Sequence, residues 1–373
     1  MNIEKLKDIV QDCNVNFLFG SGMSAEYLRT LGTIEILLTA VEDVANQEHR
    51  DIIRTSLYKT YFDGVIEKNL NILNNDNSTT ALMDNYKNFF TIFNKILLQR
   101  KSTLLSKQIN IFTTNIDICI EKALEDKAFE YNDGFIGSFK PKFDLSNFKK
   151  SLFKSSLHFE NKSELPVFNI YKIHGSLTWK MIRDNIHFSP TLKLIKNISE
   201  ISVSDDTLVN IDSNDTIKTL EKKSSKITYN TTEIKNFKNA YEKLNIVNPT
   251  KDKFRTTILN QTYYELLRIY SNELEKDNSI LFVLGFSFAD EHIRDLTLRV
   301  ANSNPTLIIY IIAYDDYSNE DLKSKFTDIK YNNVKIFAPT KNEDGTDNFS
   351  YSFNNINSKI FKRLELKILE DRI

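Results

Sequence analysis

The stretch Ser279-Ile-Leu-Phe-Val-Leu-Gly-Phe-Ser-Phe-Ala-Asp-Glu-His292 shows the local pattern from which the fold of this chain can be inferred. Residues that favour β-structure stop at a polar turn that contains glycine, and a helix is predicted to follow over 291–302. Three earlier stretches have the same order of strand and polar turn: 15–24, 108–117 and 166–176. The repeated unit predicts parallel strands joined by helices.

The strands in these units are almost continuously apolar, as in parallel sheets that are buried on both faces. Amphipathic helices are predicted at 79–98 and 256–275, and two further strands and a helix at 306–313, 334–337 and 355–371. We therefore expect an α/β fold with a Rossmann-like parallel sheet and helices on both faces. Ligands of such sheets bind beyond the carboxyl ends of the strands, so the four polar turns should line one crevice.

The remaining segments are expected to form insertions rather than further strands of this sheet. A helix-rich segment at about 34–100 and a polar segment at about 190–245 should together form a smaller lobe, while 126–163 is expected to be rich in loops. We expect residues 1–313 to form one domain, and the strand and helix in 314–373 to complete it.

Composition and charge exclude several classes of protein. The 373 residues are 41% hydrophobic and 12% aromatic, which excludes wholesale disorder. With 49 basic and 50 acidic residues the chain has no bulk attraction for nucleic acid, and its longest apolar run is too short to cross a membrane. Two cysteines, Cys13 and Cys119, cannot build a four-cysteine zinc site, and five histidines show no ligand spacing, so we expect no metal. The low cysteine count suits a reducing cytoplasm.

The first glycine-containing turn, Gly20-Ser21-Gly22-Met-Ser24, is a candidate for binding phosphate. Glycines let main-chain N–H groups approach a pyrophosphate closely, and the start of the predicted helix would add a favourable dipole. The third glycine of the common dinucleotide fingerprint is missing, so a plain tight turn explains the motif equally well.

The later turn, Gly285-Phe-Ser287-Phe-Ala-Asp290-Glu-His292, also connects a strand to a helix. Gly285 and Ser287 could approach an adenosine, and Asp290 is a good N-cap for the helix that follows. His292 falls in the first helical turn, where a surface or packing role is the simpler interpretation.

The other two turns carry groups that could take part in chemistry. Thr113-Thr114-Asn115-Ile-Asp117 offers hydroxyls, an amide and a carboxylate that can bond ribose hydroxyls. Taken by itself, the motif is better explained as a helix N-cap, a role that Asp117 could fill alone. His174 follows the third strand, and imidazole is the side chain best suited to general-base catalysis at neutral pH. A structural histidine bonded to a neighbouring loop is the alternative.

Taken in order, Gly-Ser-Gly-x-Ser, Thr-Thr-Asn-Ile-Asp, Lys-Ile-His-Gly-Ser and Leu-Gly-Phe-Ser-Phe-x-Asp-Glu-His resemble the motifs of the sirtuin-like NAD-consuming enzymes. The chain looks most similar to the bacterial branch that acts in antiphage defence, often beside a HerA-type ATPase. The resemblance runs from about Val15 to Ala313 and includes Asn248-Pro-Thr-Lys-Asp-Lys-Phe.

The resemblance implies a role for each motif. The first motif would hold the pyrophosphate of NAD, the second would lie against the nicotinamide ribose and nicotinamide, and the last would contact the adenosine half. The residues concerned are Gly20, Ser21, Gly22 and Ser24; Thr114, Asn115 and Asp117; and Gly285, Ser287, Asp290 and His292. His174 would be the catalytic histidine, with Asn115 as the second catalytic residue.

The activity that the resemblance implies is hydrolysis of NAD to ADP-ribose and nicotinamide, with NAD as substrate and no metal. Protein-deacylating sirtuins carry a four-cysteine zinc module, which this chain cannot build, so water is the favoured acceptor. Two alternatives remain open. One is protein deacylation or ADP-ribosyl transfer, and the other is a non-catalytic NAD-sensing scaffold.

Regulation by assembly is also expected, because a constitutively active NAD hydrolase would starve its own cell. Two helix faces carry more aromatic residues than one face must bury, which suggests contact with other subunits. The residues are Phe89, Phe90 and Phe93, and Tyr263, Tyr264 and Tyr270. We expect a homo-oligomer that works with a second protein such as a HerA-type ATPase.

Overall fold

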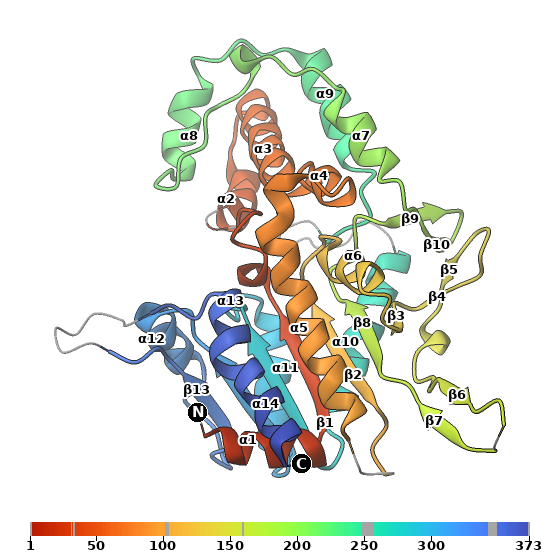
Figure 1. The fold of residues 1–373 in the computed structure, drawn as a ribbon. Helices are drawn as coiled ribbons and strands as arrows, with labels where there is room; N and C mark the ends of the chain where they lie inside the picture. Colours follow the sequence, from red (N-terminus) through yellow and green to blue (C-terminus); the bar gives the residue numbers. More distant parts are fainter. Residues whose placement is uncertain are drawn as a thin grey trace.

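A parallel sheet forms the centre of the computed structural model, which describes residues 2–30, 32, 34–100, 104–158, 160–247, 257–341 and 349–371 (Figure 1). Its strands are β1 (Asn14–Phe19), β2 (Gln108–Thr113), β3 (Tyr131–Asn132), β8 (Val167–Lys172), β11 (Ser279–Leu284), β12 (Ile308–Ile312) and β13 (Val334–Phe337). Their spatial order is β13-β12-β11-β1-β2-β8-β3, and each neighbouring pair is parallel. Apart from the edge strand β3, this is the strand order of Rossmann folds, so the predicted fold class is confirmed.

The four strands that end in the polar turns are neighbours in the sheet, in the order β11-β1-β2-β8. Phe19 at the end of β1 is level with Leu284 of β11 and with Thr113 of β2, and Thr113 is level with Lys172 of β8. Because these strands are parallel and in register, the turns that follow them lie side by side at one edge. The strand order reverses between β1 and β11, which is where sheets of this kind bind ligands.

Helices cover both faces of the sheet, because alternate side chains of each strand point to opposite sides. One face carries α1 (Ile3–Asp12), α5 (Thr80–Leu98), α6 (Cys119–Asp126) and α14 (Lys362–Glu370), and the other carries α10 (Thr257–Leu274), α11 (Glu291–Ser303) and α12 (Asp316–Lys325). Phe17 of β1 belongs to the first core and its neighbour Leu18 to the second. In Figure 1, α5 and α14 lie in front of the sheet and α10 lies behind it. Within the described residues, none of the helices combines the length and apolarity needed to cross a membrane.

A helical lobe contacts the carboxyl edge of the sheet and lies at the top of Figure 1. It combines α2 (Ile34–Ala40), α3 (Gln47–Tyr61) and α4 (Asn69–Leu73) with α7 (Lys193–Ser199), α8 (Ile217–Ser224) and α9 (Thr231–Tyr241). The rings of Tyr58 and Tyr241 stack with their centroids 4.4 Å apart and join the two segments. Asn69 Oδ1 accepts a hydrogen bond from Ile118 N–H at 3.0 Å, which ties the lobe to the turn after β2.

The helix α5 packs on the sheet, although we expected the whole segment 34–100 to join the lobe. Phe89 meets Phe17 of β1, and Phe90 meets Phe168 of β8, each with ring centroids 5.1 Å apart. Of the aromatic residues from which we inferred contact with other subunits, all but Tyr264 are buried. Because these rings fill the protein's own cores, they do not support an interface between subunits.

Short antiparallel strands occur between residues 135 and 164, although the sequence pattern predicts mainly loops at 126–163, and two more follow between residues 179 and 188. They are β4 (Phe135–Ile136), β5 (Lys142–Phe143), β6 (Phe153–Ser155), β7 (Lys162–Glu164), β9 (Trp179–Ile182) and β10 (Asn185–Phe188). Four of them form a small second sheet in the order β4-β5-β10-β9, and β6 pairs with β7. Strands this short do not show the alternation by which strands are recognised. A short helix, α13 (Phe353–Ile356), precedes α14.

Candidate functional site

The two glycine turns pack directly against each other where β1 and β11 end. Gly20 N–H donates to Leu284 O at 3.0 Å, and Gly22 N–H donates to Gly285 O at 2.9 Å. A Cβ atom on Gly20 would lie 2.4 Å from Gly285 O, and one on Gly285, where φ is +61°, would lie 2.5 Å from Met23 N. The close main-chain contact between the turns therefore requires glycine at both positions.

The first turn does not lead directly into an α-helix, which corrects the expectation from its sequence. Ser21–Met23 forms a single 3₁₀ turn, and the next described α-helix begins at Ile34. The described residues directly after this turn therefore do not supply the helix dipole that the sequence led us to expect. The side chain of Ser21 is exposed, whereas that of Ser24 is buried.

A buried hydrogen-bond network links the first turn to the turn after β2. Ser24 Oγ donates to Asp117 Oδ2 at 3.0 Å and lies 2.9 Å from the hydroxyl oxygen of Tyr86 on α5. The other carboxylate oxygen of Asp117 accepts from Cys119 N–H at the start of α6, at 3.1 Å. Ser24 and Asp117, both predicted to contact NAD, thus bond to each other inside the protein.

Asn115 follows β2 and faces the turn after β1. Its Nδ2 donates to Gly20 O at 3.0 Å, and its main-chain N–H donates to Thr113 Oγ1, also at 3.0 Å. Thr113 Oγ1 in turn donates to Phe19 O at 3.1 Å, and the half-buried Thr114 donates its N–H to the same oxygen at 3.3 Å. These bonds hold the Asn115 amide beside the first glycine.

His174 and Asp290 form a pair that joins the turn after β8 to the turn after β11. His174 Nε2 lies 3.1 Å from Asp290 Oδ2, with 18% of the histidine side chain exposed. Asp290 Oδ1 accepts from His292 N–H at 3.0 Å and from Ile293 N–H at 3.3 Å, so Asp290 is the N-cap of α11, as predicted. A cavity of about 10 Å³ lies between His174 and Tyr263.

Two residues of this arrangement, Lys172 and Tyr86, had no role assigned from the sequence. Lys172 is buried at the end of β8, where its ammonium lies 3.3 Å from Asn115 O and 3.2 Å from Glu121 Oε2 and also donates to Asp117 O. The signal that could have identified it is a lysine in a mainly apolar strand, because a buried charge needs buried partners. Tyr86 could not be distinguished from the apolar stripe of α5.

Burial shifts the pKa values of several groups in this network. Burial, reinforced by the charge of Asp117, raises the pKa of the Tyr86 phenol and of the Cys119 thiol well above their ordinary values. Both groups therefore stay protonated at neutral pH, and Cys119 is not available as a thiolate nucleophile. Burial also raises the pKa of Glu121, and the nearby Lys172 opposes this effect.

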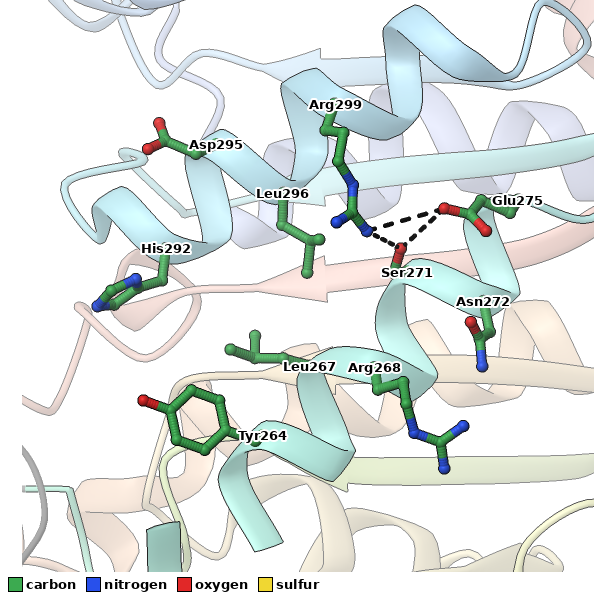
Figure 2. Close-up of a pocket in the computed structure, with 10 residues that line it drawn as sticks. All are labelled: Tyr264, Leu267, Arg268, Ser271, Asn272, Glu275, His292, Asp295, Leu296 and Arg299. Atoms are coloured by element: carbon green, nitrogen blue, oxygen red, sulfur yellow. Dashed lines mark hydrogen bonds and ion pairs between the residues drawn. The ribbon is translucent and has the colours of Figure 1, made fainter. Parts of the chain in front are cut away.

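Only some of the residues predicted to act in the last turn lie against the other turns. Ser287 is exposed and its carbonyl accepts a hydrogen bond from Lys325 Nζ at 2.9 Å. His292 is exposed on α11, where it lines a cavity of about 490 Å³ between α10 and α11. Figure 2 shows His292 and Tyr264 on the same side of this cavity, and Arg299 bonded to Ser271 on the other. The position of His292 therefore fits a surface role better than contact with the other turns.

Two further expectations concern metal binding and the stretch before α10. Among the described side chains, no group of three or more His, Cys, Asp or Glu residues is placed to hold a metal ion. The stretch Asn248-Pro-Thr-Lys-Asp-Lys-Phe lies outside the described residues.

The fold and these contacts define a Rossmann-like α/β protein with a histidine–carboxylate pair at the carboxyl edge of its sheet. A scan against protein-family models finds no match, and a search of curated proteins finds no significant match. A functional assignment therefore depends on the arrangement of the residues and on the order of the motifs.

Proposed function

We propose that this chain is an NAD hydrolase, which converts NAD and water into ADP-ribose, nicotinamide and a proton. The proposal is carried by one observation: His174, bonded to Asp290, and Asn115, bonded to Gly20, follow neighbouring strands of the sheet. Both side chains lie at the edge where Rossmann-like sheets bind dinucleotides. The order of the four motifs, which resembles that of sirtuin-like enzymes, supports the same substrate.

The proposed reaction needs few catalytic groups. The nicotinamide ring of NAD is already cationic, so the electron pair of the breaking C1′–N bond neutralises it and no general acid is required. Asn115 would orient the ribose or the attacking water, and His174 would take the proton that the water loses as its oxygen bonds to C1′. Asp290 would orient the imidazole and stabilise its charged form as the proton arrives.

The two glycine turns are the proposed contacts of the dinucleotide backbone. The glycines let the two turns pack closely, and the main chain at the exposed Gly22 and the half-buried Gly285 would be the part that a ligand can reach. Ser21 has an exposed side chain at this edge, whereas the hydroxyl of Ser24 is bonded to Asp117. We infer that Ser21, rather than Ser24, contacts the phosphates.

The proposed cellular role is that of a regulated effector in antiphage defence, which stops infection by depleting NAD. The resemblance of the four motifs to the bacterial defence branch supports this role. A homo-oligomer and a HerA-type ATPase partner belong to the same proposal.

Release of nicotinamide from NAD, followed by chromatography, tests the proposed activity. The wild type should release nicotinamide without any added acyl or peptide acceptor. His174→Ala and Asn115→Ala should each lower turnover by about 10²- to 10⁴-fold. His158→Ala is the matched control, because His158 is exposed in the β6–β7 hairpin. Turnover that needs an acylated peptide would indicate deacylation, and NAD binding without nicotinamide release would indicate a scaffold.

A further inference from the structure

Lys172 ends β8 with its side chain inside the protein, where 3% of it is exposed. Its ammonium lies 3.3 Å from Asn115 O and 3.2 Å from Glu121 Oε2, and it donates to Asp117 O. Two of the three N–H donors of the ammonium group serve the carbonyl groups of Asn115 and Asp117, and the contact with Glu121 is an ion pair. One buried cation therefore joins the end of β8, the turn after β2 and helix α6.

The two carbonyl groups that Lys172 binds belong to the turn that carries Asn115. Lys172 holds the main chain of this turn at Asn115 and Asp117, and the amide of Asn115 reaches away to Gly20 O at 3.0 Å. His174 lies two residues beyond Lys172 at the same strand end. The main-chain segments that carry Asn115 and His174 are thus fastened together by one side chain.

We propose that Lys172, with Glu121 as its counter-ion, is a positioning residue that sets the place of Asn115 relative to His174. This inference rests on the proposed NAD hydrolysis, because relative position matters to catalysis only if both side chains act on one substrate. Lys172 is buried, so it acts through the turn and not by contact with the substrate. A displacement of about 1 Å in such a pair can lower the rate by about a hundredfold.

A buried ion pair also affects stability, and the choice of variant separates this effect from catalysis. Removing one partner leaves an unpaired buried charge, whereas replacing both by apolar side chains of similar size is often neutral for stability. The double variant Lys172→Met, Glu121→Leu should therefore fold, but it lacks the donor to the carbonyls of Asn115 and Asp117.

Thermal unfolding and steady-state nicotinamide release are compared between this double variant and the wild type. We expect a Tm below that of the wild type, because two buried carbonyl groups lose a donor, together with a KM within about threefold and a kcat lower by about tenfold or more. Lys95→Met, Glu365→Leu is the matched control, because Glu365 is a buried carboxylate that pairs with Lys95 at 3.1 Å between α5 and α14. This control should change kcat by less than about twofold. A double variant of Lys172 and Glu121 with wild-type kcat would overturn the proposal.

Hydrogen exchange tests the same positioning without turnover. The N–H groups of Ile118 and Cys119, bonded to Asn69 Oδ1 and Asp117 Oδ1, report on the turn. In the double variant they should exchange about tenfold faster or more, while amides of β1 keep their protection. Lys172→Met, Glu121→Gln, which removes both charges and keeps the shape of the Glu121 side chain, should show the same change, and it replaces the first double variant if that variant does not fold. Unchanged exchange would refute the positioning role. If exchange is faster in the variant but the wild type does not cleave NAD, the result refutes the proposed hydrolase activity instead.

Discussion

Asp290 performs two tasks that substitution can separate. Its Oδ1 accepts from His292 N–H at 3.0 Å and from Ile293 N–H at 3.3 Å at the start of α11, and its Oδ2 lies 3.1 Å from His174 Nε2. Asp290→Asn keeps an oxygen for the helix cap but replaces the oxygen that faces His174 by an amide NH₂ group. Asp290→Ala removes both groups.

The sizes of the two effects follow from these contacts. Loss of the cap in Asp290→Ala should lower the free energy of unfolding by about 0.5–2 kcal/mol, whereas asparagine is an equally good N-cap and should cost less than about 0.5 kcal/mol. A hydrogen bond to a charged group contributes about 1.5–3 kcal/mol, which corresponds to about a 10- to 150-fold change in rate. Both variants should show this loss of rate, because both lack the carboxylate that the proposed mechanism assigns to the support of His174.

Chemical denaturation and nicotinamide release from NAD, measured on the same preparations, separate the two tasks. Asp290→Asn should be slow but about as stable as the wild type, and Asp290→Ala should be both slow and less stable. Asp315 is the matched control, since it is the N-cap of α12 and accepts from Ser318 N–H at 2.8 Å. Asp315→Ala should lose a similar amount of stability and keep its turnover.

The result that would refute this reasoning is turnover of Asp290→Asn within about threefold of the wild type. The carboxylate would then have no part in the chemistry of His174. If Asp290→Ala lost turnover and Asp290→Asn did not, the loss would be due to the missing cap at the start of α11.

Three further predictions concern the structure around the site. Gly20→Ala places a Cβ 2.4 Å from Gly285 O, so it should lower the free energy of unfolding by about 1–3 kcal/mol in chemical denaturation, and wild-type stability would contradict the described contact. Asn110→Leu removes the donor that lies 2.9 Å from Oδ1 of the buried Asn16 and should cost about 1–3 kcal/mol in the same assay, and wild-type stability would contradict this contact. Burial raises the pKa of Tyr86 well above its ordinary value of 10.0, so the stability that this phenol provides is complete below that pH and is lost as the pH rises towards the folded-state pKa. In an alkaline titration followed by tyrosinate absorbance, the last phenols should ionise together with unfolding, and complete ionisation of a still folded chain would disprove the assignment.

The elements around the site could be predicted because their signals are local. The run Ser279–Leu284 forms β11 with the bounds that its apolar residues indicate, and Asp290 caps α11 as its position before the helix indicates. The stripe of aromatic and aliphatic residues at helical spacing likewise predicted α5 almost to its ends. In each case the residues that decide the conformation are within a few positions of one another.

The contacts of the site were harder to predict from the sequence, because they join residues far apart in the chain. His174 and Asp290 are separated by 116 positions, and Ser24 and Asp117 by 93. From its motif alone, Ser24 was expected to contact a phosphate, but its hydroxyl is taken up by Asp117 and Tyr86. A motif shows which groups are present at a turn, and it does not show which of them turn inward.

Local residue patterns thus sufficed for the class of fold, for most strands of the main sheet and for the four turns that follow β1, β2, β8 and β11. The tertiary structure alone decided that these four strands are neighbours, that α5 belongs to the sheet layer, and that Lys172 holds the turn of Asn115. The physical reason is that backbone preference and periodicity depend on adjacent residues, whereas strand order, burial and ion pairing depend on the free energy of contacts between distant parts of the chain.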